Sequence, residues 1–253
     1  MKKKSSCVSY QSIYRLECSS WWKKYWWRQG RDFTAQLLLK RFLKPDRKNK
    51  ILDVGCGLGE TSKKLTIFGQ VVGIDSSPEA IKLAQKNGLK KAVVMNVNNL
   101  TFPKNSFNLV TAFDVLEHIN DDQKAIKEIF RVLKNRGIFL LTAPSYNWLW
   151  SEHDEVLEHK RRYTKSQIEK KLKKAGFVIL KSSYIISSFL LPIAVFRFCQ
   201  RIFKKEKNPK TSYVILPPFL NFLLAQILKL EGFLLQAVNF PFGVSLVCVA
   251  QKK

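Results

Sequence analysis

Three glycines at alternate positions, Gly55, Gly57 and Gly59, follow directly on an apolar segment near the start of the chain. Glycine lets the chain turn tightly off a strand and lets a ligand lie against bare backbone. A carboxylate, Asp75, closes a second apolar segment at 71–74, and Asp53 stands two residues ahead of Gly55. Because a glycine loop after one strand and a carboxylate after the next is how α/β folds hold a ribose, this spacing predicts a nucleoside site. The alternative is a plain structural turn.

The three histidines of the chain all fall between residues 118 and 159. His118 comes just after the expected fourth strand, and His153 and His159 follow the fifth. Ligands of open parallel sheets bind beyond the carboxyl ends of the strands, so these side chains should converge near the glycine loop. A neutral imidazole can accept a proton from a hydroxyl, which makes His118 and His153 candidate catalytic groups. The alternative is that His118 only braces its loop.

Alternating strands and helices must hold these groups in place. Strands are expected at 50–54, 70–74, 91–95, 107–113, 137–142, 177–184 and 244–250, and helices at 34–43, 60–68, 78–88, 121–133 and 164–175. Ser77 before Pro78 marks one helix start, and Thr164 with Gln167 forms a capping box at another. Short connections between alternating elements predict an α/β fold with a mostly parallel, seven-stranded sheet and helices on both faces.

The glycine loop and Asp75 together resemble the first motifs of the class I S-adenosylmethionine-dependent methyltransferases. Residues 94–107 are similar to a family segment that reads G-D-A-x-x-L-P-F-x-x-x-S-F. The resemblance implies a Rossmann-like fold with S-adenosylmethionine as cofactor. Asp75 would accept from the ribose hydroxyls, Asp53 would lie near the methionine ammonium, and Asn96 would meet the adenine amino group where the family usually has Asp. The implied cofactor residues are Asp53, Gly55, Cys56, Gly57, Gly59, Asp75, Ser76, Asn96, Val97, Phe113 and Asp114.

A second resemblance covers the region after the fifth strand. The run W-S-x-H-D…H-x-R-R-Y-T at 150–164, with the tryptophans near the N-terminus, is similar to a bacterial branch of type-11 methyltransferases often associated with envelope polysaccharide and polyprenyl-linked sugars. Paired guanidinium groups suit a phosphate or pyrophosphate, whereas salt bridges to Glu155 or Glu158 are the alternative. The substrate contacts expected on this basis are His159, Arg161, Arg162, Tyr163, Trp26 and Arg28.

A metal-assisted O-methyltransferase is another interpretation of the acceptor side. Some O-methyltransferases of ubiquinone synthesis and small-RNA 2′-O-methyltransferases hold a divalent ion with Glu-x-x-Glu-His. This chain has Asp114 at the first position, then Glu117 and His118, and His153 or His159 could complete the set. Because the first position is substituted, no metal ligand is assigned.

The charge of the chain is divided unevenly along its length. Residues 1–50 carry 14 basic against 3 acidic residues, residues 51–159 carry 12 against 13, and residues 160–253 carry 18 against 3, within a total of +25. Codon bias toward lysine should raise the middle segment as well, so a basic surface facing anionic lipid or nucleic acid is favoured. Five cysteines without a C-x-x-C pair indicate a reduced, cytoplasmic chain, and 1–9 does not read as a signal peptide.

An insert that the core fold does not need separates the last two strands. Residues 182–196 carry no charge, Pro192, Pro241 and Gly243 interrupt its apolar runs, and basic residues crowd at 197–210. Apolar helices beside lysines suit a membrane interface, as do the tryptophans at 21–27. A soluble cap over the site and an RNA methyltransferase are the alternatives. The expected divisions are an arm at 1–48, a core at 49–184, the insert at 185–241, and a last strand and tail at 242–253.

The expected function is therefore O-methylation of a lipid-linked or amphiphilic acceptor by a protein peripheral to the inner face of an anionic membrane. A cofactor-binding protein without transferase activity is the non-enzymatic alternative, and it rests on the Asn96 departure. The oligomeric state and the acceptor are not predicted from the sequence.

Overall fold

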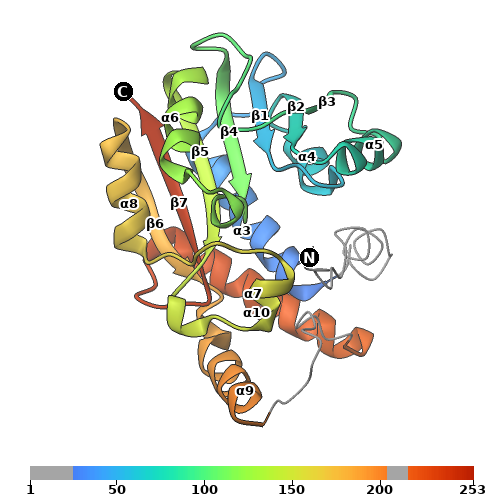
Figure 1. Ribbon diagram of the computed structural model, residues 1–253, viewed down its shortest axis with the longest axis vertical. Helices are drawn as coiled ribbons and strands as arrows, with labels where there is room; N and C mark the ends of the chain where they lie inside the picture. Colours follow the sequence, from blue (N-terminus) through green and yellow to red (C-terminus); the bar gives the residue numbers. More distant parts are fainter. Residues whose placement is uncertain (1–24, 204–215) are drawn as a thin grey trace, which may run out of the picture.

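A seven-stranded sheet forms the centre of the molecule, as the computed structural model of residues 25–203 and 216–253 shows (Figure 1). The strand order is β3-β2-β1-β4-β5-β7-β6. The strands are β1 (Lys50–Val54), β2 (Gln70–Asp75), β3 (Ala92–Val94), β4 (Phe107–Phe113), β5 (Leu133–Pro144), β6 (Phe177–Ile185) and β7 (Ser245–Lys252). Strand β7 is antiparallel to its neighbours β5 and β6, and the other pairings are parallel. The predicted fold class, a mostly parallel Rossmann-like sheet, is confirmed.

Helices cover both faces of this sheet because its strands present apolar side chains to both sides. Ile51 and Leu109 pack with one group of helices, and Leu52 and Val110 pack with the other. The first face is covered by α3 (Trp26–Phe42), α4 (Glu60–Leu65), α5 (Pro78–Lys86) and α10 (Pro218–Ala237), and the second by α6 (Asp122–Val132) and α8 (Lys165–Lys174). The carboxyl ends of β1, β2 and β4 thus meet at one edge between the two layers.

Helix α3 begins at Trp26, eight residues before the helix expected at 34–43. The spacing of apolar residues does not predict this earlier start, because Gly30 has no side chain and Arg31 is charged. Both residues nevertheless lie on sides of α3 that pack against other parts of the molecule. A Cβ at Gly30 would lie 2.4 Å from the Cβ of Leu228, so α3 and α10 cross closely at this glycine. Tertiary packing against α10 therefore extends the helix beyond what its own sequence indicates.

The insert consists of η3 (Ser187–Phe189), α9 (Leu190–Phe203) and α10, with the short helices η2 (Asn147–Leu149) and α7 (Glu152–Val156) nearby (Figure 1). It begins at Ile186, a buried β-branched residue in the left-handed region with φ 60°. The carboxylate of Glu231 on α10 accepts hydrogen bonds from the backbone amides of Ser187 and Ser188 at 3.0 and 3.1 Å. These bonds hold the strained entry of the insert against α10. Of the arm predicted at 1–48, residues 1–24 lie outside the described residues.

Candidate functional site

The glycine loop is a cradle of backbone held by one carboxylate. Gly55 and Gly57 adopt positive φ values of 67° and 49° directly after β1. The amide of Gly57 donates to one oxygen of Asp75 at 3.0 Å, and the amide of Ser77 donates to the other at 2.9 Å. A Cβ built on Gly57 meets no atom within 4 Å, so the loop borders open space at this residue. The two features that predicted a nucleoside site therefore lie together.

A cavity of about 1110 Å³ extends from this loop toward the histidines. Its volume slightly exceeds the ~300–1,000 Å³ usual for small-molecule sites, which leaves room for a second ligand beside a nucleoside. The predicted cofactor residues that line it are Asp53, Gly55, Cys56, Gly57, Asp75, Ser76, Asn96, Val97, Phe113 and Asp114. Gly59 does not line the cavity; it lies at the start of α4 with φ 78°, where it serves the turn.

Asp53 lies beneath the loop rather than projecting freely from it. Its carboxylate accepts hydrogen bonds from Ser62 Oγ at 2.5 Å and Thr111 Oγ1 at 2.7 Å. Burial raises the pKa of Asp53 to about 6, against the lowering effect of those two hydroxyls. The contact predicted between Asp53 and a methionine ammonium stays a prediction, since both carboxylate oxygens already hold α4 and β4 to β1.

Asn96 stands at the cavity rim after β3. Its Oδ1 accepts from the amide of Asn98 at 2.9 Å, which makes an Asx turn of the kind that this side chain favours. One lone pair of that oxygen is still available, so the structure is compatible with the turn and with the predicted adenine contact together.

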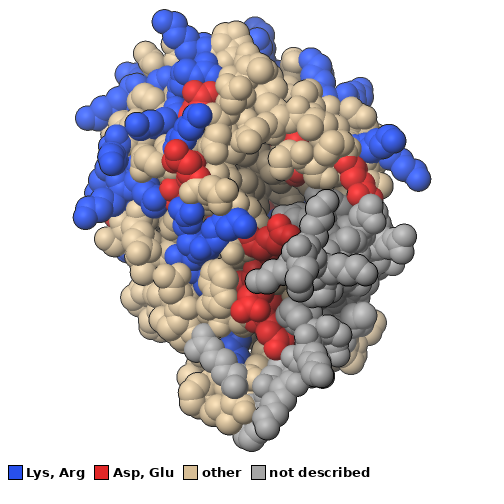
Figure 2. Space-filling view, in the orientation of Figure 1, with Lys and Arg blue, Asp and Glu red and all other residues tan. Residues whose placement is uncertain are grey.

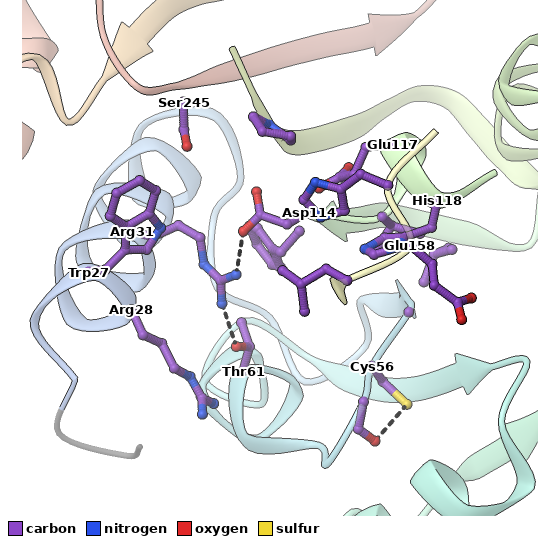
Figure 3. A pocket seen from close by; sticks show the side chains of 18 of the residues that line it. Trp27, Arg28, Arg31, Cys56, Thr61, Asp114, Glu117, His118, Glu158 and Ser245 are labelled. Carbon is purple, nitrogen blue, oxygen red and sulfur yellow. Dashed lines mark hydrogen bonds and ion pairs between the residues drawn. The ribbon is translucent and has the colours of Figure 1, made fainter. Parts of the chain in front are cut away.

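An ion pair that the sequence did not predict closes the cofactor side of the cavity (Figure 3). Arg31 reaches from α3 to Asp114 at 2.8 Å, to Asp32 at 3.0 Å and to Thr61 Oγ1 at 3.3 Å. Asp114 ends β4 with a φ of 55°, and its second oxygen accepts from Thr142 at 2.9 Å. The two carboxylates outweigh burial and raise the pKa of Arg31. The sequence gives no sign of this role, because Arg31 is not part of the apolar pattern of α3. It becomes visible only from the positive φ of Asp114 and from the ion pair itself.

Glu117 forms the floor of the cavity together with two histidines. Its side chain is fully buried, and neither carboxylate oxygen has a hydrogen-bond partner among the described residues. Burial, with Asp114 nearby, raises the pKa of Glu117 well above its usual value. The ring centroids of His118 and His159 lie 4.7 Å apart in an edge-to-face arrangement, and those of His153 and His159 lie 6.4 Å apart. The predicted convergence of the three histidines is thus observed.

Burial determines the protonation of two of these rings. It lowers the pKa of His118 to about 4, with the nearby His159 adding to the effect. It lowers the pKa of His153 to about 3, and here Arg197 is the next contribution. Both imidazoles are therefore neutral near pH 7.

Asp154 anchors this histidine group from below. Its carboxylate receives a bidentate pair from Arg162 at 2.8 and 3.0 Å, and it lies 2.7 Å from Nδ1 of His159. Arg197 of α9 lies 3.9 Å from the same carboxylate and donates a short hydrogen bond to the carbonyl of Leu149. This contact at Nδ1 fixes the orientation of the His159 ring, and His159 lines the cavity. Residues 151–154 form the capping box of α7, which was the available sequence signal for this aspartate.

The predicted phosphate-binding pair of arginines is not assembled. Arg161 lies outside the cavity, where it pairs with Asp122 at 3.2 Å. Tyr163 is 2% exposed and donates to Leu116 and Asp122 beneath the sheet edge, so its prediction as a substrate contact is wrong. Arg162 does line the cavity, but its guanidinium is committed to Asp154. Adjacent residues of an extended segment point to opposite sides, so Arg161, Arg162 and Tyr163 do not all face the cavity. The run of residue types in the sequence does not show which of them do.

The remaining predicted substrate residues lie on the acceptor side. Trp26, Arg28 and His159 line the cavity, as do Trp27 and, on the insert, Pro192, Ile193, Phe196 and Leu216. The ligand atoms of Glu117, His118 and His159 lie within 4.8 Å of one another, close enough to hold a divalent ion after small movements. Asp114, which the metal interpretation placed first, is instead paired with Arg31.

Comparison with known proteins agrees with this geometry. Residues 52–141 match the methyltransferase domain family. A ubiquinone biosynthesis O-methyltransferase of Xanthomonas oryzae is 39% identical over 37% of this chain and 42% of its own length. An ajmaline N-methyltransferase of Rauvolfia serpentina is 31% identical over 60% of this chain and 55% of its own. The chain thus spans less than two thirds of the length of these relatives.

Solved structures share the fold. The phosphoethanolamine N-methyltransferase 2 of Haemonchus contortus, in complex with S-adenosylmethionine, superposes with a TM-score of 0.59 at 22% identity, over 89% of this chain and 52% of that one.

The loop, the sheet and the match over residues 52–141 together define the class of that segment: it is a methyltransferase domain of the class I, S-adenosylmethionine-dependent type. Its cofactor is S-adenosylmethionine, and the residues present fit that group. The open space at Gly57 admits a ligand against the backbone, and Asp75 is placed at the end of β2 where a ribose would lie.

Proposed function

We propose that the chain transfers the methyl group of S-adenosylmethionine to an oxygen atom of an amphiphilic or lipid-linked acceptor at a membrane surface. The observation that carries the proposal is the single cavity that joins the glycine loop to a polar floor and an apolar wall. The floor is made of Glu117 and the histidines, and the wall of aromatic and aliphatic side chains from α3 and the insert. An acceptor with one polar and one apolar end fits such a lining.

The bound cofactor supplies an electrophilic methyl group on a positively charged sulfur. The loop at Gly55–Gly59 and Asp75 would hold S-adenosylmethionine, which would give up its methyl group and leave as a neutral thioether, so an acceptor hydroxyl would have to lose its proton. His118 and His159 lie at the floor where that proton would leave, and His118 is neutral. The main contribution of the chain is to hold the two reactants in line and away from water.

An oxygen acceptor is favoured by the imidazoles, since a hydroxyl must give up a proton during transfer, and by the similarity to the ubiquinone O-methyltransferase. The similarity to ajmaline N-methyltransferase makes a nitrogen acceptor the competing outcome. The test is transfer of a labelled methyl group to a lipid extract, compared with total RNA. Label in the lipid fraction, in a product that resists acid as an ether does, is expected. Label in RNA or in an amine would contradict the proposal.

His118→Ala should leave the affinity for S-adenosylmethionine unchanged and slow methyl transfer by about 10²-fold if the imidazole takes the proton. Glu158→Gln, a conservative change at an exposed residue that also lines the cavity, is the control. Equal rates in the wild type and His118→Ala would show that this histidine only braces its loop.

Metal assistance is the second candidate, and one observation favours it. The buried carboxylate of Glu117 has no partner among the described groups and lies beside two imidazoles. Glu117, His118 and His159 would hold the ion, whose chemistry is to lower the pKa of a bound hydroxyl. The metal content of the purified chain and of Glu117→Gln decides this: a stoichiometric ion lost in the variant supports the metal, and a metal-free wild type that remains active excludes it.

A further inference from the structure

Helix α9 has two different faces. Pro192, Ile193, Phe196 and Arg197, which share one face, line the cavity. The opposite face carries Leu191, Val195, Phe198 and Ile202, which are 73%, 53%, 61% and 58% exposed. The spacing of these four, i, i+4, i+7 and i+11, makes one continuous stripe along the helix. The same helix thus forms a wall of the site and an apolar surface of the molecule.

The charge on α9 points inward. Among its described side chains, at 190–200 and 202, Arg197 alone is charged, and it is 7% exposed because it turns toward Leu149 and Asp154. A helix on the surface of a protein in water normally presents charged side chains to the solvent. Among its described side chains, the outer face of α9 presents none, which indicates a partner that is itself apolar.

Helix α10 also exposes an apolar face. Phe219, Phe222, Leu223, Leu230 and Leu234 are between 44% and 77% exposed and recur at helical spacing. The opposite face packs on α3, where a Cβ on Gly232 would lie 2.7 Å from Thr34 Oγ1. In Figure 1 both helices lie in the lower half of the view, below the carboxyl ends of β1 and β4.

The 20-residue length and apolar composition of α10 would suffice to cross a membrane. Two contacts argue that it lies along the surface instead. Its face of small residues is packed against α3, and Glu231, 5% exposed in the middle of the helix, is bonded to the backbone of Ser187 and Ser188. A helix fixed to its own domain on one side can bury only its other side in lipid.

The charge of the sequence identifies the kind of bilayer. The stretch 204–210, which follows α9, contains Lys204, Lys205, Lys207 and Lys210 against one acidic residue, Glu206, and Arg201 belongs to the last turn of α9 itself. On the face shown in Figure 2, most of the described basic side chains lie in the upper half and along the left side of the view. Cations that directly follow an apolar helix fit a surface of anionic headgroups.

We infer that the outer faces of α9 and α10 lie in the interface of an anionic bilayer, and that the apolar chain of the acceptor enters the cavity from the lipid along the inner face of α9. The inference rests on the proposed function and narrows it: the acceptor is an amphiphile whose chain remains in the membrane while its polar end reaches the floor at Glu117. Pro192, Ile193 and Phe196 form the path between the two environments.

The first test measures sedimentation of the full chain with phosphatidylglycerol-containing vesicles. Leu191→Lys with Phe198→Lys places two charges on the outer face of α9 and should weaken vesicle binding at least about tenfold. The control is Ile67→Lys, at an exposed apolar residue outside the insert (55%, against 73% for Leu191 and 61% for Phe198), which should bind as the wild type does. Equal binding by all three proteins, binding unaffected by salt, or a soluble dimer that buries the stripe would overturn the inference.

The second test separates the path from the surface. Ile193→Trp places a larger side chain on the face of α9 that lines the cavity, so it should narrow the route by which the acceptor chain enters. This variant should keep vesicle binding while labelled methyl transfer to lipid-embedded acceptors falls about tenfold or more. Leu191→Lys with Phe198→Lys should lose that transfer through lost binding. Full transfer by either variant contradicts entry along α9.

Calorimetry with S-adenosylmethionine shows whether a negative result counts against the proposed function or only against the inference about the membrane. Both variants should bind the cofactor as the wild type does, because the glycine loop is untouched. Loss of cofactor binding in the wild type itself would refute the proposed function, whereas intact binding and lipid methylation without vesicle dependence would refute the inference alone.

Discussion

Two glycines allow the cofactor role of the loop to be measured apart from backbone strain. Gly57 and Gly88 both have positive φ, 49° and 92°, and a Cβ at either position meets no atom within 4 Å. Alanine at either site should cost about 1 kcal/mol of unfolding free energy. Only Gly57 lines the cavity, so only Gly57→Ala should weaken S-adenosylmethionine binding, by tenfold or more. Equal affinities in the two variants would show that the ligand does not approach Gly57.

Asp53 makes a prediction about pH. Its pKa is about 6 in the folded, cofactor-free chain, above the ordinary value near 3.8. Because the folded state holds this proton more tightly, the stabilisation is complete below about pH 4 and is lost as the pH rises through 6. Asp53→Asn cannot titrate, so its unfolding free energy relative to the wild type should improve by on the order of 2–3 kcal/mol between pH 4 and 7. Denaturant unfolding at both pH values measures this, and a constant difference would contradict the assignment.

Residue identity predicted the cofactor side better than the acceptor side. Gly55, Gly57 and Asp75 could be placed from sequence because the loop needs positive φ and the carboxylate ends a strand. Tyr163 could not, since its role depends on which side of an extended segment it faces. Arg31 escaped for a different reason: its partner Asp114 is 83 residues away, and no local pattern links them.

Among the elements, the entry to the insert is the point most dependent on a single side chain. Glu231 accepts from the amides of Ser187 and Ser188 and from the hydroxyl of Ser188 while Ile186 is held at φ 60°. Glu231→Ala should release η3 and α9, at a cost of about 1–3 kcal/mol. Limited proteolysis should then cut within 186–217 faster than in the wild type, with cofactor affinity unchanged.

The control for that experiment is Glu79→Gln, at an exposed position on α5. Unchanged cleavage in Glu231→Ala would mean that packing of α10 on α3 is enough to hold the insert.

The crossing of α3 and α10 gives a second test of elements. Gly30→Ala raises helix propensity by about 1 kcal/mol but forces a Cβ against Leu228, so it should lower the melting temperature. Combining it with Leu228→Gly removes the Cβ that it would meet, and in the double-mutant cycle the two changes should cost less than their sum. An additive cycle, or stabilisation by Gly30→Ala alone, would contradict the close crossing.

Elements with strong local signals were predicted well, and those made by tertiary contact were not. Strand β4 at Phe107–Phe113 and the capping box of α8 at Thr164 lie where the sequence indicates. Strand β5 begins at Leu133 rather than at 137, because a bulge lets Leu133 pair with Phe107. The start of α3 depends on α10, almost 200 residues away, which no local pattern contains.

At the scale of the whole molecule, the distribution of charge and apolar surface follows the proposed task. The segment 51–159, which builds most of the cofactor site, is nearly neutral, whereas the flanks hold the basic excess. The insert adds exposed aromatic and aliphatic side chains at one end of the molecule and lines the acceptor side of the cavity. One chain therefore combines a nucleoside site with a surface suited to an acceptor that does not dissolve in water.

The central claim is that the loop at Gly55–Gly59 and the carboxylate of Asp75 bind S-adenosylmethionine, and titration calorimetry on the full chain tests it directly. We expect one site for S-adenosylmethionine and for its demethylated product, with binding weakened at least about tenfold in Asp75→Ala and unchanged in Glu79→Gln. Absence of heat in the wild type, or equal affinity in Asp75→Ala, would contradict the account.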